Sequence, residues 1–371
     1  MSRVKLGDVA VEVRESTKQP EGMAIVGLEH LTPGDLQLSQ WSEESENTFT
    51  KVFHQGQILF GRRRAYLKKA AVAPFDGVCS GDITVIAAKP ERIHPRLLPF
   101  IIGDDRFFDY AMEKSAGSLS PRVKWAQLAE YEFDLPDTDK QHQLVDLLWA
   151  MERTKKAYQN LLAQTDELVK SQFVEMFGAE KEYSRMTLAE VCTKITDGTH
   201  KTPDYQESGI AFISAKNIID GKLSFDDIKH ITEKEYTEIQ RRCRTEKGDV
   251  LMAKSGSLGT VAIVETDDPL GLFESLAVLK YDRTKLDGVF LHSQLQSESV
   301  QQQLMSGVKG VAVKHLHLNV ISQIRIIVPP IEEQRIFAEF VIQTDKSKLA
   351  IQQALDSLEK SRNAIMKKVF G

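Results

Sequence analysis

The chain carries, at residues 117–148, the stretch GSLSPRVKWAQLAEYEFDLPDTDKQHQLVDLL, which aligns without a gap with GVAVKHLHLNVISQIRIIVPPIEEQRIFAEFV at residues 310–341. The alignment pairs Gly117 with Gly310, Pro136 with Pro329 and Gln141 with Gln334, and its register continues until Phe177-Gly178 falls on Phe370-Gly371. Identical residues are few, but they keep one order and one register. The sequence therefore predicts a tandem duplication.

The segments that precede this stretch also align. KLGDVAVEV at residues 5–13 matches TLAEVCTKI at residues 187–195, and both alternate apolar and polar residues. GQILFGRRRAYLKKAAV, from Gly56, matches GDVLMAKSGSLGTVAIV, from Gly248, which places Arg62 on Lys254. Only one sizeable insertion separates the halves, so a shared fold with a pseudo-two-fold internal repeat is the better explanation.

The tail of each half has a heptad pattern. Its seam positions advance in alternating steps of four and three residues and are mostly apolar. They are Leu144, Leu148, Met151, Lys155, Tyr158, Leu162, Thr165, Val169, Gln172 and Met176, and then Phe337, Val341, Thr344, Lys348, Ile351, Leu355, Leu358, Arg362, Ile365 and Val369. Prolines and acidic residues precede each pattern, as is typical where a helix begins: Pro136, Asp137 and Asp139, and Pro329-Pro330, Glu332 and Glu333. The pattern predicts two long helices, at residues 139–178 and 331–371.

A helix of about 38 residues is about 57 Å long, too long to bury its seam against one small domain. The predicted partner is the helix of the other half, which gives a two-helix rod. Lys155 and Arg362 interrupt the seam and indicate solvated or partner-facing stretches. The alternative is an amphipathic helix that lies on its own domain.

The regions before each helix read as mixed α+β heads. GDITVIAAKP, ESLAVLKYD and ISQIRIIVPP are typical of strands, and HPRLLPFIIGDDRFFDYAMEK and GVFLHSQLQSESVQQQLMSG of helices. We expect small sheet cores and divide the chain into a head at 1–138, a helix at 139–178, a head at 179–330 and a helix at 331–371. GAEKEYSRM, from Gly178, is the linker.

Composition excludes some classes of protein. The 371 residues are 42% hydrophobic and 27% charged, the balance of a multi-domain globular chain. Cys79, Cys192 and Cys243 are odd in number and far apart, which argues against a disulfide framework and a zinc site. Apolar runs are far shorter than the roughly 20 residues of a membrane span, and no export signal is evident, so we expect a cytoplasmic protein. A net charge of −5 means that any DNA contact must come from local basic patches.

Two loops offer groups suited to phosphates and base edges. RRRAYLKK surrounds Tyr66 with five cations, among them Arg62, Arg63, Arg64 and Lys68. DGTHKTP presents Thr199, His200 and Lys201 on a loop stiffened by proline. The alternatives are a solvated strand edge and a structural loop. Further candidates follow the aligned glycines: Ser118, Arg122 and Lys124 in the first half, and Lys309, Lys314 and His315 in the second. RRCRTEK, residues 241–247, we interpret as ordinary surface.

Known catalytic motifs are missing from the sequence. It has no GxxxxGK[ST] phosphate loop, and KSGSLG at Lys254 lacks that spacing. His315 and His317 have no third ligand close in sequence, so no metal is expected.

The sequence resembles the specificity subunits of Type I restriction-modification systems over essentially its whole length. The resemblance rests on the repeated head and helix, on DGTHKTPDY, FISAKNI and GDVLMAKSGSLG, and on Gly310 leading to VPPIEEQ. These motifs add Lys216, Asn217, Lys254 and Ser255 to the DNA-binding candidates. The first half has DLPDTDKQ instead and lacks DGTHKTP, which is compatible with heads that read different sequences.

The resemblance implies a non-catalytic DNA-binding subunit. Its heads would be target-recognition domains that each read one half of a split target, and its helices an antiparallel coiled coil that fixes their spacing. Two methyltransferase subunits with S-adenosylmethionine, and motor-nuclease subunits with ATP, would be its partners. Neither proline site, Leu135-Pro136-Asp137 or Val328-Pro329-Pro330-Ile331, has the Asn/Asp-Pro-Pro-Tyr/Phe pattern of such methyltransferases. The alternatives are a protein-binding scaffold, favoured by the acidic net charge, and a solitary modifying enzyme, for which the chain leaves no catalytic domain.

Overall fold

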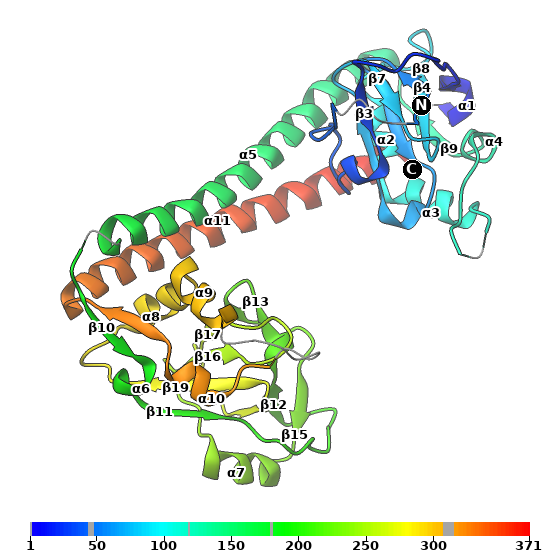
Figure 1. Ribbon diagram of the computed structural model, residues 1–371. Coiled ribbons are helices and arrows are strands. Elements are labelled where there is room, and N and C mark those ends of the chain that lie inside the picture. The colour runs from blue at the N-terminus through cyan, green and yellow to red at the C-terminus, as the bar shows by residue number, and fades with distance from the viewer. Residues whose placement is uncertain (1, 44–47, 118, 179–180, 307–314) are drawn as a thin grey trace. The chain divides into compact units, whose positions relative to one another are not determined.

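Two forty-residue helices, α5 (Thr138–Phe177) and α11 (Ile331–Phe370), follow the two heads (Figure 1). The computed structural model describes residues 2–43, 48–117, 119–178, 181–306 and 315–371. By its contacts the chain divides into a first unit, Met1–Leu161 with Ile351–Gly371, and a second unit, Leu162–Ala350. Each unit contains one head and part of both long helices. The division into four separate domains stays a prediction.

The first head contains nine strands, four short helices and two 3-10 turns within the described residues. In chain order they are β1 (Ser2–Lys5), α1 (Leu6–Val9), β2 (Ala10–Val13), β3 (Ala24–Val26), η1 (Leu28–His30), β4 (Lys51–Phe53), β5 (Ile58–Gly61), η2 (Ala65–Leu67), β6 (Ala70–Val72), β7 (Gly77–Cys79), β8 (Ile83–Ala88), α2 (Leu98–Ile102), α3 (Asp105–Glu113), α4 (Trp125–Leu128) and β9 (Glu132–Leu135).

The second head contains more elements than the first. In chain order they are β10 (Ser184–Thr187), α6 (Leu188–Val191), β11 (Cys192–Asp197), β12 (Ile210–Ile213), η3 (Ala215–Asn217), β13 (Ile218–Ile219), β14 (Lys222–Leu223), β15 (Lys229–Ile231), α7 (Glu233–Arg242), β16 (Val250–Ala253), β17 (Val261–Ile263), β18 (Leu270–Leu272), β19 (Leu276–Tyr281), α8 (Gly288–Leu295), α9 (Glu298–Ser306), α10 (Leu318–Ser322) and β20 (Arg325–Val328). The stretches predicted as helices and strands contain α2, α3, α8 and α9, and β8, β19 and β20.

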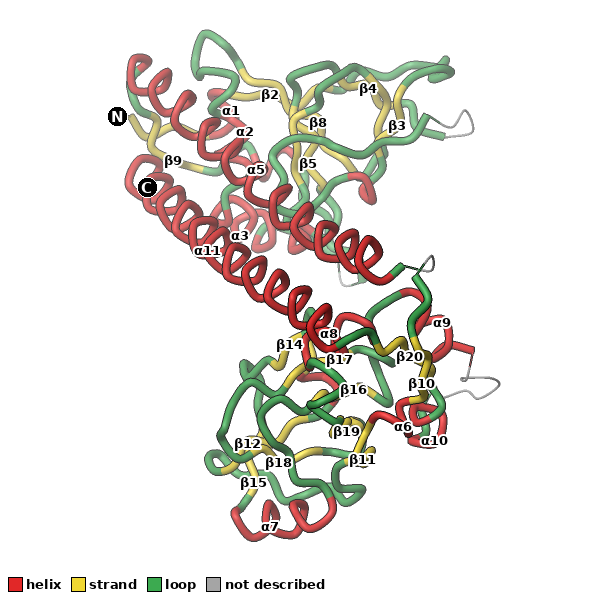
Figure 2. Tube along the Cα trace, turned by 90° about the vertical axis from the view of Figure 1, so that its left-hand side faces the viewer, coloured by secondary structure: helices red, strands yellow, loops and turns green. Residues whose placement is uncertain are grey.

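A four-stranded antiparallel sheet forms the centre of each head (Figure 2). Its strand order is β2-β8-β5-β6 in the first head and β11-β19-β16-β17 in the second. Buried apolar residues face each other at corresponding positions, Leu59 opposite Val85 in one head and Leu251 opposite Val278 in the other. The mixed α/β class with small sheets is therefore confirmed.

The three-stranded sheets show where the heads differ. In the first head, β7 is central and pairs with β3 and β4, whereas in the second head β12 is central and pairs with β18 and β15. In the second head β15 pairs with β12, and α7 follows β15, so this sheet is built around a different central strand. The surface next to it is therefore also different.

In each unit α5 and α11 contact each other and run in opposite directions. In the first unit α5 follows β9 directly, and the ring of Phe370, at the end of α11, lies 6.5 Å from that of Phe133 in β9. In the second unit Phe177, at the end of α5, lies 5.6 Å from Phe337, near the start of α11. Ion pairs join the helices further along, Lys155 with Glu359 and Lys348 with Asp166. Coiled-coil packing in the strict sense stays a prediction.

A buried glutamine holds each long helix to its head. Gln334 accepts the N–H of Asp287 at 2.9 Å and donates to the carbonyl oxygens of Pro329 at 2.7 Å and Lys285 at 2.9 Å. Gln141 makes the matching bonds in the first unit, from the N–H of His94 at 2.8 Å and to Pro136 at 2.9 Å. The aligned proline and glutamine therefore have one shared structural role.

The stability of the second unit is expected to fall in mild acid because of His292 on α8. Its Nε2 lies 3.0 Å from the carbonyl oxygen of Gly221 and 3.3 Å from that of Val261. Burial lowers the pKa of His292, so the unfolded chain, with a histidine pKa of about 6.5, takes up the proton first. Stability is complete above pH 6.5 and is lost as the pH falls toward the folded pKa. Urea midpoints at pH 7.5 and 5.5 should differ more for the native chain than for His292→Gln; equal differences would contradict this role.

None of the helices in the described residues combines the length and the hydropathy that a membrane span requires.

Candidate nucleic-acid interface

Two arginines of the first head meet at one carboxylate. Arg63 lies two residues after β5, Asp82 directly before β8, and Arg122 shortly before α4. Arg122 donates from Nε to Asp82 at 2.7 Å, and Nη1 of Arg63 lies 3.3 Å from the same carboxylate. The hydrogen bond from Arg122 is the first reason that the pKa of Asp82 lies below its usual range. Two guanidinium groups share one acidic partner, so the cluster keeps a net positive charge at the surface.

The turn after Arg63 carries the other predicted residues of this head. Arg64 and Tyr66 are exposed, and Lys68 forms a 2.6 Å ion pair with Asp105 at the start of α3. The Nε of Arg62 is buried and has no hydrogen-bond partner among the described residues. The structure brings together Arg63 and Arg122, which the sequence proposes separately, and adds Asp82, which sequence reasoning missed.

Lys124 and Ser118 are the remaining predicted residues of the first head. Lys124 is exposed immediately before α4, and its backbone N–H donates to the side chain of Gln127 at 3.0 Å. Ser118 lies outside the described residues.

In the second head three basic side chains, those of Lys254, Arg242 and His200, converge on Asp197 at the end of β11. Lys254 Nζ and Arg242 Nη2 each lie 2.5 Å from one of its oxygens, and His200 Nε2 lies 3.3 Å away. The other ring nitrogen of His200 is 2.6 Å from Glu274. Burial by itself would raise the pKa of Asp197, but the hydrogen bonds from Lys254 and Arg242 outweigh it, so this pKa is lowered. The carboxylate therefore stays ionised and holds the cations in place.

Lys254 is reassigned by its burial. The sequence predicts it as a DNA contact, but its side chain is only 3% exposed and its amine is bound to Asp197. An ammonium group enclosed in this way cannot reach a phosphate, so Lys254 supports the loop that follows it. Ser255, the next residue, is half-buried and stays a candidate.

The loop of DGTHKTP lies beside α7, and together they line a pocket of about 160 Å³. Thr199 Oγ1 accepts the N–H of Lys201 at 3.1 Å, which fixes the turn and leaves Lys201 exposed. Arg242 borders the same pocket from the last turn of α7. Sequence reasoning treated Arg242 as ordinary surface, because nothing in its own segment indicates that Asp197 is its partner.

Lys216 and Asn217 lie on η3. Lys216 is exposed and pairs with Asp227 at 2.8 Å. Asn217 is buried, and its side-chain oxygen accepts the N–H of Ser214 at 3.0 Å, so it is corrected from a DNA contact to a residue that shapes this turn.

The last three candidates follow Gly310 in the sequence. Lys309 and Lys314 lie outside the described residues. His315 is half-buried; burial, and then the nearby charge of Lys254, lower its pKa, so its imidazole is neutral at pH 7. Its ring lies 5.4 Å from that of His317. Among the described residues no cluster of three or more histidine, cysteine or acidic residues could hold a metal ion.

One backbone arrangement supports both candidate surfaces. In the first head the N–H of Arg62 donates to the carbonyl oxygen of Asp82 at 2.9 Å, and the carbonyl oxygen of Arg62 accepts the N–H of Val123 at 3.0 Å. In the second head the N–H of Lys254 donates to Ser275 at 2.7 Å, and its carbonyl accepts from Leu316 at 2.8 Å. The residues paired by the alignment thus occupy the same place in the backbone, while their side chains have different partners.

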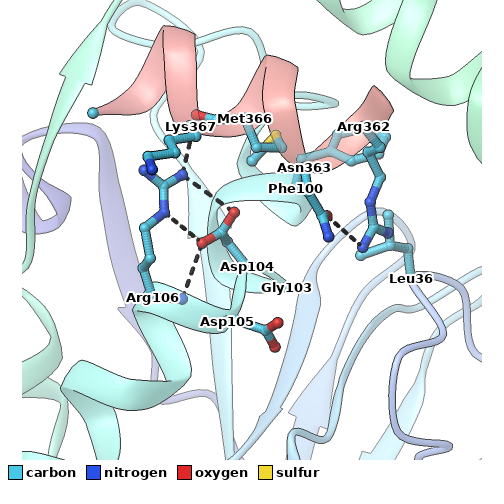
Figure 3. Close-up of a pocket in the computed structure, with 11 residues that line it drawn as sticks. Leu36, Phe100, Gly103, Asp104, Asp105, Arg106, Arg362, Asn363, Met366 and Lys367 are labelled. Carbon is cyan, nitrogen blue, oxygen red and sulfur yellow. Dashed lines mark hydrogen bonds and ion pairs between the residues drawn. The ribbon is translucent and has the colours of Figure 1, made fainter. Parts of the chain in front are cut away.

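A larger pocket, of about 400 Å³, lies in the first unit between α3 and the end of α11 (Figure 3). Arg106 reaches across it, donating to Asp104 at 2.8 Å and to the carbonyl oxygen of Met366 at 3.1 Å. Because that carbonyl belongs to the last turn of α11, the arginine ties the helix to the head. None of the predicted DNA-binding residues borders this pocket, and we assign it a structural role.

Comparisons with known proteins confirm the resemblance inferred from the motifs. Residues 180–360 match the family model described as the Type I restriction modification DNA specificity domain. The Type I restriction enzyme EcoDI specificity subunit of Escherichia coli is 25% identical over 190 residues, 47% of this chain and 40% of that protein. The EcoBI specificity subunit of the same organism is 27% identical over 177 residues, 47% of this chain and 37% of that protein. The matched stretch thus spans less than half the length of these two relatives.

Solved structures show the same fold over the whole chain. The Type-I restriction-modification S subunit from M. genitalium superposes with a TM-score of 0.63 at 14% identity, covering 100% of this chain and 96% of that one. A chain from a study of complex assembly and conformational transition of the type I R-M system gives a TM-score of 0.58 at 20% identity, covering 99% and 97%. At these identities the likeness concerns the fold alone.

Proposed function

We propose, from the match of residues 180–360 to a DNA specificity domain, that the chain is the sequence-specific DNA-binding subunit of a Type I restriction-modification complex. Each head reads one half of a two-part target. Arg63, Arg64 and Arg122 in the first head, and His200, Lys201 and Arg242 in the second, are the basic residues best placed to meet DNA.

The observation that carries this proposal is the shared backbone frame with unlike side chains. Arg62 and Lys254 hold the same backbone position, but the side chains around them differ. In the first head Arg63 and Arg122 share Asp82, whereas in the second head Lys254 itself is buried against Asp197. A duplicated reader of one sequence would need the same contact residues in both copies. Two frames that differ in their polar groups suit two unlike half-sites.

The long helices would fix the distance between the half-sites and dock the partner subunits. We propose two methyltransferase subunits, which would bind S-adenosylmethionine, and motor-nuclease subunits, which would bind ATP. This chain would direct adenine methylation and cleavage without catalysing either. Methyl transfer by the purified chain alone would overturn this part of the proposal.

Binding of the chain to random duplex DNA at increasing salt tests the proposal against a scaffold that binds proteins. The logarithm of affinity should fall linearly with the logarithm of salt concentration, and Arg64→Gln should reduce the slope by about 0.9 if Arg64 meets one phosphate. Arg153→Gln, on the exposed side of α5, is the matched control and should leave the slope unchanged. Absence of DNA binding at low salt would favour the scaffold.

A further inference from the structure

Two large apolar side chains, Tyr66 and Leu67, are exposed next to each other on η2, between β5 and β6. They are 52% and 40% accessible, whereas Ala65 before them is buried in the core of the head. These adjacent side chains stand on an otherwise basic loop, so they offer an apolar contact surface next to positive charge.

The backbone around this tip is strained. Arg64, with φ 55° and ψ 57°, and Lys68, with φ 50° and ψ 47°, both adopt the left-handed conformation. Among the described residues other than glycine, Asp220 alone shares a positive φ with them. Side chains with a Cβ atom rarely occupy this region, and such strain gathers where a protein must present a group in one orientation.

Neighbouring segments hold the strained turn in place. The N–H of Arg64 donates to the carbonyl oxygen of Pro121 at 2.9 Å, and the amine of Lys68 is bound to Asp105 of α3 at 2.6 Å. The amine of Lys69 donates to the carbonyl oxygen of Leu28 at 2.7 Å. Three parts of the head thus fix the turn, so Tyr66 and Leu67 form a rigid tip.

The surroundings of the tip are complementary to DNA. Arg63 and Arg64 precede the tip on the same loop, and Arg64 is exposed. Arg63 shares the carboxylate of Asp82 with Arg122. Phosphates can pair with these cations, and the apolar group that a base pair offers in the major groove is the C5-methyl of thymine. The equivalent loop of the second head, Lys254–Thr260, exposes no large apolar side chain.

We propose that Tyr66 and Leu67 contact a thymine methyl group in the half-site of the first head. This inference rests on the proposed function, because it requires that the first head binds duplex DNA. The alternative apolar contact is insertion between two base pairs, which unstacks them. The two modes respond differently to the removal of one methyl group.

The test uses the full chain and a duplex obtained by selection from a random pool. Deoxyuridine replaces each thymine of the half-site in turn, which removes the methyl group and keeps the base pair. At one position or two neighbouring positions the native chain should lose affinity about fourfold, the effect expected for one buried methyl group. The double variant Tyr66→Ser/Leu67→Ser should bind more weakly and should not distinguish deoxyuridine from thymine there.

Two controls separate this contact from a change in folding. Tyr66→Phe keeps the ring and should retain the discrimination, and Tyr205→Ser removes an exposed aromatic residue of the second head and should not affect it. Indifference of the native chain to deoxyuridine at every position would overturn the inference while leaving DNA binding intact. A different outcome is that the native chain, but not the serine double variant, raises the fluorescence of 2-aminopurine in the half-site while deoxyuridine has no effect. That result would overturn the methyl contact in favour of insertion between base pairs. Failure to bind any DNA would instead contradict the proposed function.

Discussion

Replacing Gln334 with leucine is expected to lower the free energy of unfolding of the second unit by about 3 kcal/mol or more. The side chain is fully buried and bonds to three backbone groups, the N–H of Asp287 and the carbonyl oxygens of Pro329 and Lys285. Leucine fills the space but bonds to none of them, and each buried unpaired group costs about 1–3 kcal/mol. Urea unfolding followed by circular dichroism measures the loss.

Gln141→Leu is the matched change in the first unit, where Gln141 bonds to His94 and Pro136. The three tryptophans, Trp41, Trp125 and Trp149, all belong to the first unit. The urea midpoint of their fluorescence should therefore fall for Gln141→Leu and stay unchanged for Gln334→Leu. Gln353→Leu, on the exposed face of α11, should have little effect. Losses below about 1 kcal/mol for both buried glutamines would contradict the shared role.

Replacing Asp197 with leucine is expected to destabilise the second head by about 3–5 kcal/mol, because it leaves a buried ammonium group without a partner. Lys254 and Asp197 are 3% and 4% exposed, so water cannot take the place of the lost contact. The loop of His200 and the end of α7 would lose their common acceptor as well. DNA binding by the second head should weaken even where that head remains folded, and unfolding and affinity are measured on the same preparation.

The double variant Asp197→Leu/Lys254→Met shows whether the buried charge causes the loss. Both charges are then removed together, and most of the stability should return, since a buried pair is often replaceable by apolar residues of similar size. DNA affinity should stay reduced, because Arg242 and His200 still lack the carboxylate that orients them. Equal stability of the single and the double variant would contradict this explanation.

The long helices could be predicted from the sequence because their signals are local. Proline and acidic residues mark each start, and a seven-residue period marks each seam. The ungapped alignment also pairs Gln141 with Gln334, although nothing in either segment indicates why a glutamine is needed there. Repetition makes this position visible, since two halves with few identities both keep it.

The candidate site was predicted less well, because its contacts join distant segments. Lys254 resembles a phosphate ligand in its own loop, and its burial becomes apparent only through Asp197, 57 residues away in the chain. Asp197 begins the motif DGTHKTP, but reasoning from exposed donors selected the residues after it. Arg242 ends an inserted helix whose sequence is merely charged.

The strained turn of the first head had no sequence signal at all. Left-handed conformations are expected at glycine, yet here they occur at Arg64 and Lys68. Neighbouring segments impose them through Pro121 and Asp105. The sequence predicts a basic loop here, with a solvated strand edge as the alternative, but only tertiary contacts reveal its backbone conformation.

Selection of binding sites from a duplex pool with a long random core tests the central claim most directly. The full chain should enrich two short sequence blocks, different from each other, separated by a gap of fixed length and no sequence preference. The double variant Tyr66→Ser/Leu67→Ser should weaken the sequence preference in one block and leave the other block unchanged. A single continuous block, two identical blocks, or no enrichment over the starting pool would contradict the account.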